Sequence, residues 1–431
     1  MSTAIKSHGV RRAAVPVGKT IFAQIAERLT RTDSIDLAWG NWDKWVGQRG
    51  EQELDHGARV FRKSPHSYAP PLGLPEFRRA LAKKYELETG GPIRVDNVIV
   101  TVSGATGAMW STVRHIIRAH GEARQGEQSR KVAFFCPAYF YPPFKTIINR
   151  EGGRIYAYGL DKRGQPSVSS LDEQVGLAIK NGHSPSSIYV NSPHNPTGAI
   201  YARSKLEGFI EVARERGLPI IADEVYFRVV MPEARSRVMH VASLISGSDK
   251  NPVSVVQVDS PSKSKAWCGS RVGWVYFVDL RNFPMKQIKS GISEDMQILL
   301  GAPRVYQEFG GQGNVIINPD TGPLMAEIRK RRDAAMDAFN IEGMTIHHKP
   351  QAGFYLWIEL DKNFGKWNSD VEFSMKLAEV AGIGVSPGLA FYCGEPGKEP
   401  GMFIRVALVQ PVESIHGAGE RTREFMKKEK R

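Results

Sequence analysis

The chain has 431 residues, with 58 Lys or Arg against 45 Asp or Glu, and its formal net charge is +13. This length exceeds what one hydrophobic core usually fills, and a hydrophobic content of 41% excludes an intrinsically disordered chain. Three scattered cysteines (Cys136, Cys268 and Cys393) are too few for a disulfide framework or a cysteine-rich metal site. We therefore expect two domains of unequal size, no bound metal, and a reducing, cytoplasmic compartment.

The positive charge is distributed along the chain, and its densest runs are residues 329–332 and 427–431. The first run lies in a predicted helix over residues 325–339, where a solvated basic face is expected. No helix-turn-helix, zinc-finger or RNA-binding signature accompanies the charge, so we expect no nucleic-acid partner. No run approaches the about 20 apolar residues of a membrane-spanning helix, and the N-terminal residues lack a signal-peptide pattern, so we expect no membrane partner.

Short apolar segments alternate with helical patterns in the first 300 residues, which is typical of a mostly parallel sheet covered by helices. The predicted strands cover residues 97–102, 131–135, 154–158, 187–190, 219–222, 253–258 and 272–278. Helices are predicted over residues 74–87, 107–119, 171–180 and 204–216. After about residue 300 the pattern predicts helices over 325–339 and 371–381 and strands over 345–348, 354–360 and 402–408. This last part indicates a smaller α+β domain.

Polar groups follow five of the predicted strands, at the edge where ligands bind in an open α/β sheet. Residues 103–107 (SGATG) form a small-residue turn that opens a helix, and its N–H groups suit a phosphate. The other segments supply an aromatic ring, an amide, a carboxylate with a phenol, and a lysine with an arginine: Tyr139, Asn195, Asp223, Tyr226, Lys263 and Arg271. Each group alone also suits a structural role. Together they favour pyridoxal 5′-phosphate (PLP), whose aldehyde, ring nitrogen, phenolate oxygen and phosphate would use all of them.

Three motifs in chain order resemble those of the fold-type I PLP-dependent aminotransferases, the class I/II group that is similar to aspartate aminotransferase. Residues 195–198 (NPTG) resemble the NPxG element of the family, and residues 223–226 (DEVY) resemble its DExY element. Residues 260–273 contain SPSK and GSRVG, which resemble the lysine motif, with Arg271 eight residues after the lysine. The resemblance extends from about Trp39 to beyond Arg405.

The resemblance implies an α/β PLP-dependent transferase fold of type I, with a mostly parallel seven-stranded sheet in the large domain and a smaller α+β domain. The large PLP-binding domain would cover residues 55–310. The small domain would combine residues 1–54, which include an N-terminal arm, with residues 311–431. Tyr68 lies in a segment similar to the YxPxxGxxxLR segment of the family, with Phe77 in place of the usual leucine. In relatives this tyrosine reaches the phosphate of the neighbouring subunit, so the resemblance implies a homodimer with shared active sites.

The resemblance also implies catalytic roles. Lys263 would form the Schiff base with PLP and then move the proton, and we expect burial and nearby cations to lower the pKa of its amine. Asp223 would pair with the ring nitrogen, while Tyr226 and Asn195 would bind the phenolate oxygen. Tyr139 would stack on the ring; its alternative is an ordinary core tyrosine. By contrast, we expect three neighbours to be structural or exposed: Glu224, surface Lys265 and loop His194.

For the phosphate, the resemblance implies the turn and lysine-motif residues Gly104, Ala105, Thr106, Ser260, Ser262 and Arg271, together with Tyr68. Arginine suits this role because its planar guanidinium binds phosphate oxygens with two hydrogen bonds. On the substrate side, Arg405 would bind the α-carboxylate, with Asn195 and the backbone N–H of Gly40 nearby. The alternative for Arg405 is a solvated arginine on a strand.

Members of this family form an external aldimine and lose the Cα proton to give a quinonoid, and the fold does not determine the later steps of the reaction. Our first hypothesis is an aminotransferase that uses an L-amino acid and a 2-oxo acid. Residues 39–45 (WGNWDKW), Arg49 and the aromatic run 139–141 favour a role in specialised biosynthesis. The tryptophans would stack on a large, flat or cationic substrate group or pack on the partner subunit.

Two alternatives stay open. The first is a PLP-dependent lyase, cyclase or oxidase that acts on a larger amino acid, such as S-adenosylmethionine or arginine. The second, a minor one, is a regulatory protein that binds PLP without turnover.

Overall fold

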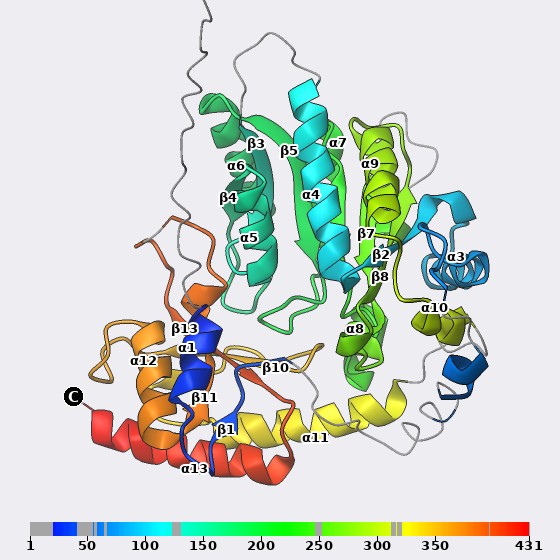
Figure 1. Ribbon diagram of the computed structural model, residues 1–431. Coiled ribbons are helices and arrows are strands. Elements are labelled where there is room, and N and C mark those ends of the chain that lie inside the picture. Colours follow the sequence, from blue (N-terminus) through cyan, green and yellow to red (C-terminus); the bar gives the residue numbers. More distant parts are fainter. Residues whose placement is uncertain are drawn as a thin grey trace, which may run out of the picture.

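The computed structural model describes residues 20–40, 55, 58–63, 67–122, 131–245, 252–311, 316, 321–395 and 397–430. Figure 1 shows a large body of helices around a central sheet, and beneath it a smaller body that contains both the first helix and the last helix. The N-terminal segment reaches the small body because β1 (Ile35–Asp36) pairs in parallel with β11 (Ile383–Gly384).

The large sheet has seven strands in the order β2-β8-β7-β6-β5-β3-β4. Their bounds are β2 (Val98–Val102), β3 (Val132–Pro137), β4 (Arg154–Tyr158), β5 (Ser184–Asn191), β6 (Ile220–Asp223), β7 (Val255–Asp259) and β8 (Val272–Val278). Neighbouring strands from β4 to β7 are parallel, whereas β8 is antiparallel to both β2 and β7. The mostly parallel seven-stranded sheet is therefore confirmed, and each strand overlaps its predicted segment.

Helices cover both faces of this sheet (Figure 1). One face carries α4 (Gly104–Glu122), α5 (Pro142–Arg150) and α9 (Met285–Ile298), and the other carries α6 (Val168–Lys180) and α7 (Arg203–Arg216). Successive residues of a strand point to opposite faces, so Phe134 packs in the first layer and Phe135 in the second. This double burial explains why the strands are apolar without alternation. Helix α3 (Pro75–Thr89) packs against β2 and β8.

The smaller body contains a four-stranded sheet in the order β12-β13-β10-β9. Its strands are β9 (Met344–Thr345), β10 (Tyr355–Leu360), β12 (Ser386–Pro387) and β13 (Met402–Ala407). The helices of this body are α1 (Ile21–Arg28), α11 (Gly322–Ala338), α12 (Asp370–Lys376) and α13 (Val412–Glu429). The additional α+β domain is confirmed. Its boundaries at residues 54/55 and 310/311 stay a prediction.

The remaining elements are short. They are α8 (Pro261–Ser264), α10 (Arg304–Gly311), the 3-10 helices η1 (Val95–Asn97), η2 (Pro232–Arg237), η3 (Val241–Leu244), η4 (Cys268–Ser270) and η6 (Gly388–Ala390), and the π-helix η5 (Leu377–Ala381). Within the described ranges, no helix has both the length and the apolar character that a membrane span requires. The same residues contain no group of three or more His, Cys, Asp or Glu side chains placed to hold a metal ion.

The basic run at residues 329–332 differs from the expected solvated face. Arg331 is 7% exposed and Arg332 is 1% exposed. Arg332 forms an ion pair of 2.7 Å with Glu233 of η2, and Arg331 pairs with Glu327 at 2.9 Å. The prediction is wrong for these two arginines, because α11 packs against segments that supply them with carboxylates and carbonyl oxygens.

Candidate active site

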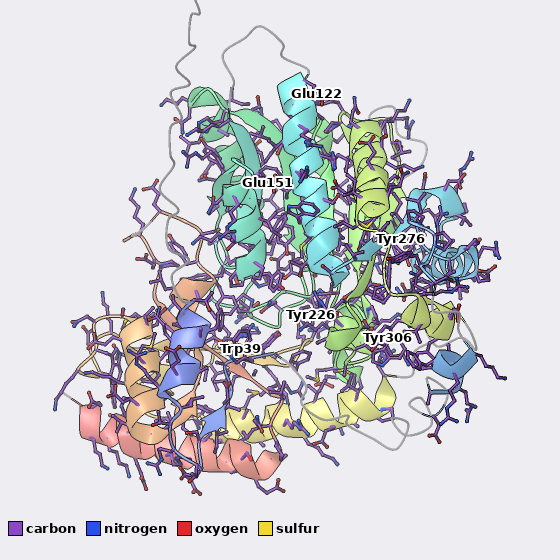
Figure 2. All side chains as sticks on the ribbon, viewed as in Figure 1. Trp39, Glu122, Glu151, Tyr226, Tyr276 and Tyr306 are labelled. Atoms are coloured by element: carbon purple, nitrogen blue, oxygen red, sulfur yellow. The ribbon has the colours of Figure 1, made fainter. Side chains whose placement is uncertain are left out.

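A cavity of about 810 Å³ lies between the carboxyl ends of the large sheet and the small body. Figure 2 shows Trp39 and Tyr226 in this central region. The large body contributes Ala105, Thr106, Asn195, Asp223 and Tyr226, followed along the chain by Ser260, Ser262, Lys263 and Arg271. The small body contributes Gly40 and Arg405. The structure therefore brings together most of the residues that the sequence predicted for one site.

Asp223 ends strand β6 and is 3% exposed. The hydroxyl of Tyr189 donates a hydrogen bond of 2.7 Å to one of its carboxylate oxygens. No lysine, arginine or histidine in the described part of the chain forms an ion pair with it. Burial therefore raises the pKa of Asp223 to about 6. A cationic N–H group placed against this carboxylate would replace the missing counter-charge.

Lys263 lies in the short helix α8, whose first turn is capped by Ser260. Its amine donates a hydrogen bond of 3.0 Å to the carbonyl oxygen of Gly40. Burial by itself lowers the pKa of this amine, but the nearby Tyr355 phenol and Cys268 thiol outweigh burial, and the net pKa is raised. The expected lowering is therefore wrong for the chain alone, because Arg405, the cation named among the main influences on this pKa, has the smallest effect of them.

Arg405, on β13, is only 5% exposed. Its guanidinium donates hydrogen bonds to Asn195 Oδ1 at 3.0 Å and to the Ala38 carbonyl oxygen at 2.7 Å. Among the described residues it has no carboxylate partner, and its Nε is buried without an acceptor. Burial lowers the pKa of this guanidinium. The solvated alternative is therefore excluded, and an incoming carboxylate would supply the missing negative charge.

Tyr355 completes this side of the cavity, although nothing in the sequence marked it beyond a predicted strand. Its hydroxyl lies 2.9 Å from the hydroxyl of Tyr226, and its ring centre lies 4.1 Å from Arg405 Cζ. A Cβ atom at position 40 would lie 2.0 Å from the Tyr355 hydroxyl, so only glycine fits there. Gly40, Tyr226, Tyr355 and Arg405 therefore fix one another in position.

The turn before α4 lies directly beside Arg271. Ser103 and Gly104 have positive φ angles of 59° and 68°, which turn the chain from β2 into the helix. The guanidinium of Arg271 donates a hydrogen bond of 2.6 Å to the Ser103 carbonyl oxygen. The Gly104 N–H donates to the Arg271 carbonyl oxygen at 2.9 Å, so Gly104 shapes the turn, while Ala105 and Thr106 face the cavity. A helix start next to an arginine is a favourable place for a phosphate.

Tyr139 is a correction to the predicted site, because it does not line the cavity. It is 5% exposed, and its ring packs against Trp357 and Tyr392 at centroid distances of 5.4 and 5.3 Å. The segment after β3 is hydrogen-bonded to the loop near residue 391, which directs Tyr139 into the small body. Tyr141 lines the cavity instead, with its hydroxyl 3.2 Å from Thr106 Oγ1.

Tyr68 lies outside the cavity of its own chain and is 76% exposed. Its predicted role at the phosphate of a neighbouring subunit stays a prediction. Trp39 is 48% exposed and lies at the cavity. Trp42, Trp45 and Arg49 lie outside the described residues.

Two further predictions concern residues close to the motifs. His194 is buried, and its ring nitrogens are bonded to Thr197 Oγ1 at 2.8 Å and to the Tyr139 carbonyl oxygen at 2.9 Å. Burial lowers its pKa to about 3, so it is a neutral, structural histidine. Lys265 is only 5% exposed, so the prediction of a surface lysine is wrong.

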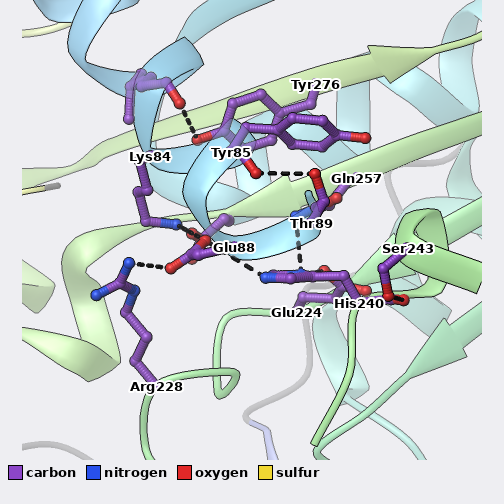
Figure 3. A network of polar contacts seen from close by, with 12 residues as sticks. Lys84, Tyr85, Glu88, Thr89, Glu224, Arg228, His240, Ser243, Gln257 and Tyr276 are labelled. Carbon is purple, nitrogen blue, oxygen red and sulfur yellow. Dashed lines mark hydrogen bonds and ion pairs between the residues drawn. The ribbon is translucent and has the colours of Figure 1, made fainter. Parts of the chain in front are cut away.

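A buried ionic network lies behind the site, and no sequence pattern indicated it (Figure 3). Lys84 of α3 forms ion pairs with Asp259 at 2.8 Å and with Glu88 at 2.9 Å. His240 lies between Glu88 and Glu224 and forms ion pairs with both. The network contacts the ends of two strands, since Glu224 follows Asp223 and the Asp259 carboxylate accepts the Ser260 N–H at 2.7 Å.

Opposite charges in this network counteract the effect of burial on its basic groups. Burial alone lowers the pKa of Lys84, but the carboxylates of Asp259 and Glu88 outweigh burial and raise it. Burial likewise lowers the pKa of His240, and Glu224 outweighs it. The network therefore joins α3 to the segments that carry Asp223 and Lys263.

Comparisons with known proteins agree with this arrangement. Residues 51–414 match the family model described as aminotransferase class I and II. An aspartate aminotransferase from Thermotoga maritima is 23% identical over 96% of this chain and 98% of its own length. A 1-aminocyclopropane-1-carboxylate synthase from Prunus mume is 27% identical over 92% of this chain and 77% of its own length. An alanine aminotransferase structure from Pyrococcus furiosus has a TM-score of 0.79 and 23% identity, and covers 95% of this chain and 98% of that chain.

The chain belongs to the aminotransferase class I and II family, because the family model covers most of its length. The similar structure shows that it has the fold of these enzymes, fold type I. It is therefore an aminotransferase-like enzyme, and the resemblance seen in the three motifs is confirmed.

Proposed function

We propose that the chain is a PLP-dependent aminotransferase that moves an amino group between an L-amino acid and a 2-oxo acid. The observation that carries this proposal is a pair of buried ionisable groups without counter-charges, which line the same cavity as Lys263. Asp223 has no cationic partner and Arg405 has no anionic partner among the described residues. A ring nitrogen that carries a proton complements the first, and a substrate α-carboxylate complements the second.

The donor set of the cavity fits PLP. Asp223 would hold a proton on the ring nitrogen, while Tyr226 and Asn195 would face the ring oxygen. Arg271 and the first turn of α4 would bind the phosphate, with Ser260 and Ser262 nearby. We assign the flat contact with the ring to Tyr141 in place of Tyr139.

The bound cofactor supplies an aldehyde for amino groups and a ring that accepts electrons. Once it is deprotonated, the Lys263 amine would take up the proton of the substrate Cα and return it. Arg405 would hold the α-carboxylate so that the Cα–H bond faces this amine. The substrate would have little freedom to move between the contacting groups Gly40, Tyr226, Tyr355 and Arg405. This restriction favours one proton transfer over side reactions.

The relatives support transamination more than the alternatives. Aspartate and alanine aminotransferases are found among both the similar sequences and the similar structures. The similar 1-aminocyclopropane-1-carboxylate synthases keep a lyase as the second candidate. Specialised biosynthesis, a cytoplasmic location and the regulatory alternative stay predictions.

We further propose a homodimer. Tyr68, Ile298, Leu299 and Leu300 are all exposed by 43% or more. The two segments that carry them approach each other, because a Cβ at Gly301 would be 3.2 Å from the Pro70 carbonyl oxygen. An exposed apolar patch of this kind is typical of a protein–protein interface. A second copy of the chain would cover it and bring Tyr68 close to another cavity.

The test of the proposed function tracks the cofactor itself. Protein loaded with PLP should be reduced by borohydride with covalent attachment at Lys263, identified by mass spectrometry of the peptide. Lys263→Ala should lose this attachment, whereas Lys162→Ala, which changes a lysine 69% exposed on the surface, should keep it. Amino acids should convert the bound PLP to pyridoxamine phosphate, and a 2-oxo acid should reverse the change. Product formation without any 2-oxo acid would instead support the lyase.

A further inference from the structure

We propose that the amino-acid substrate carries a large, uncharged, apolar side chain, aromatic or branched, and that Phe22, Trp39 and Phe391 select it. This inference rests on the proposed function and adds the class of substrate. It depends on the chemistry of the cavity wall beyond Arg405. Three segments build this wall: α1 with Phe22, the segment after β1 with Trp39, and the loop near residue 391 with Phe391.

The charged side chains of the described cavity wall already have roles. They are Asp223, Lys263, Arg271 and Arg405. Asp223 and Arg271 would bind the cofactor, Lys263 moves the proton, and Arg405 binds the α-carboxylate. In the described wall, a second carboxylate or a guanidinium on the substrate would therefore meet no counter-charge, and burying it would be costly.

The rest of the wall begins next to the carboxylate-binding arginine. The ring centre of Phe391 lies 4.6 Å from Arg405 Cζ. The ring of Phe22 meets that of Phe391 edge to face at 6.1 Å, and the ring of Trp39 lies 5.3 Å from that of Phe22. Because the side chain of an amino acid leaves the carbon that carries the carboxylate, it would extend directly along these three rings.

Further apolar residues line the cavity. Pro142, Pro143 and Ile147 of α5 line it, together with Met109 of α4. A volume of about 810 Å³ lies in the upper part of the range of known small-molecule sites, so it accommodates PLP together with a large amino acid. Aromatic rings and apolar helix residues that line one cavity favour flat or branched hydrocarbon groups over small or charged ones.

The first experiment compares substrates on the same PLP-loaded protein. The rate of conversion of PLP to pyridoxamine phosphate is measured by absorbance for L-phenylalanine, L-leucine, L-aspartate and L-arginine. We expect kcat/KM for phenylalanine or leucine to exceed that for aspartate and arginine by at least about tenfold. If kcat/KM for aspartate or for arginine equals or exceeds the values for phenylalanine and leucine, the inference is overturned and the proposed function stays intact. No conversion by any amino acid would instead overturn the proposed function itself.

The second experiment measures binding without turnover. The Kd of 3-phenylpropanoate, which is not a substrate, is compared with that of succinate by calorimetry on the same protein. We expect 3-phenylpropanoate to bind at least about tenfold more tightly. Tighter binding of succinate would contradict an apolar wall.

Variants then assign the selection to named rings. Phe22→Ala and Trp39→Ala should each lower kcat/KM for phenylalanine by about tenfold and lower that for alanine by less than about threefold, since a methyl group does not reach them. Trp39→Phe should restore part of the loss. Phe283→Ala is the matched control, because Phe283 is 47% exposed and lies outside the cavity. Equal losses for phenylalanine and alanine would show a structural role and refute the assignment.

Discussion

The substitution Asp223→Asn tests the electrostatics of the site in the cofactor-free protein. Asp223 has a pKa raised from 3.8 to about 6 by burial, so the folded chain binds this proton more tightly than the unfolded chain. The stabilisation from the bound proton is complete below pH 3.8 and is lost as the pH rises through 6. The whole loss corresponds to about 3 kcal/mol. Asparagine has no charge to desolvate, so the variant should not show this loss.

The assay is urea unfolding of the cofactor-free protein at pH 5 and pH 8, at one protein concentration. When the pH is raised from 5 to 8, the free energy of unfolding of Asp223→Asn should rise relative to that of the parent protein by about 1.4 kcal/mol. The hydrogen bond from Tyr189 favours the ionised form of Asp223, and its effect is already included in the pKa of about 6. Asp337→Asn, at an exposed position, is the control and should show no such rise. An unchanged difference between Asp223→Asn and the parent would refute the reasoning.

The same substitution should weaken PLP binding. An amide cannot act as the anion that holds a proton on the ring nitrogen, so the Kd of PLP should rise while the cofactor-free fold becomes more stable above pH 6. Such opposite effects are expected where a protein maintains a destabilising group for its function.

Three further substitutions test the surroundings of the site. Lys84→Met should lower the free energy of unfolding by about 3–5 kcal/mol, because it leaves Asp259 and Glu88 buried without their amine. The control Lys83→Met, at an exposed ion pair, should change the free energy of unfolding by less than about 1 kcal/mol. Similar effects of the two substitutions would contradict the role of the network. Tyr141→Ala should raise the Kd of PLP in an absorbance titration, and an unchanged Kd would exclude its contact with the ring. Gly40→Ala should cost about 1–3 kcal/mol of stability in urea unfolding, since its Cβ would lie 2.0 Å from the Tyr355 hydroxyl. Unchanged stability would contradict the close contact.

The strands and motifs could be predicted because their signals are local. A strand buried on both faces is a short apolar run, and each of the seven runs is recognisable without knowledge of its neighbours. The motif residues Asn195, Asp223 and Lys263 follow such strands, so the sheet topology alone brings them to one edge. Helix α1 was not predicted, because its eight residues are fewer than the roughly 11 or more that a helical period needs to be recognised from sequence.

Other parts of the site depend on contacts between distant segments. Tyr139 and Tyr141 are equivalent in sequence, and only the hydrogen bonds between the segment after β3 and the loop near residue 391 decide which ring faces the cavity. Tyr355 is ordinary in a strand until the small body places it 2.9 Å from Tyr226. Lys84 and Asp259 are separated by 175 residues, so their ion pair leaves no pattern in the sequence.

The charge of +13 shows the same division between sequence and structure. The sequence determined the number of basic residues and, through its motifs, the roles proposed for Lys263, Arg271 and Arg405. The tertiary structure decided that Arg331 and Arg332 are buried and paired, and that Arg405 is buried without a carboxylate partner among the described residues. The reason is physical: a charge is specified by one residue, but its energy depends on the burial and partners that the fold supplies.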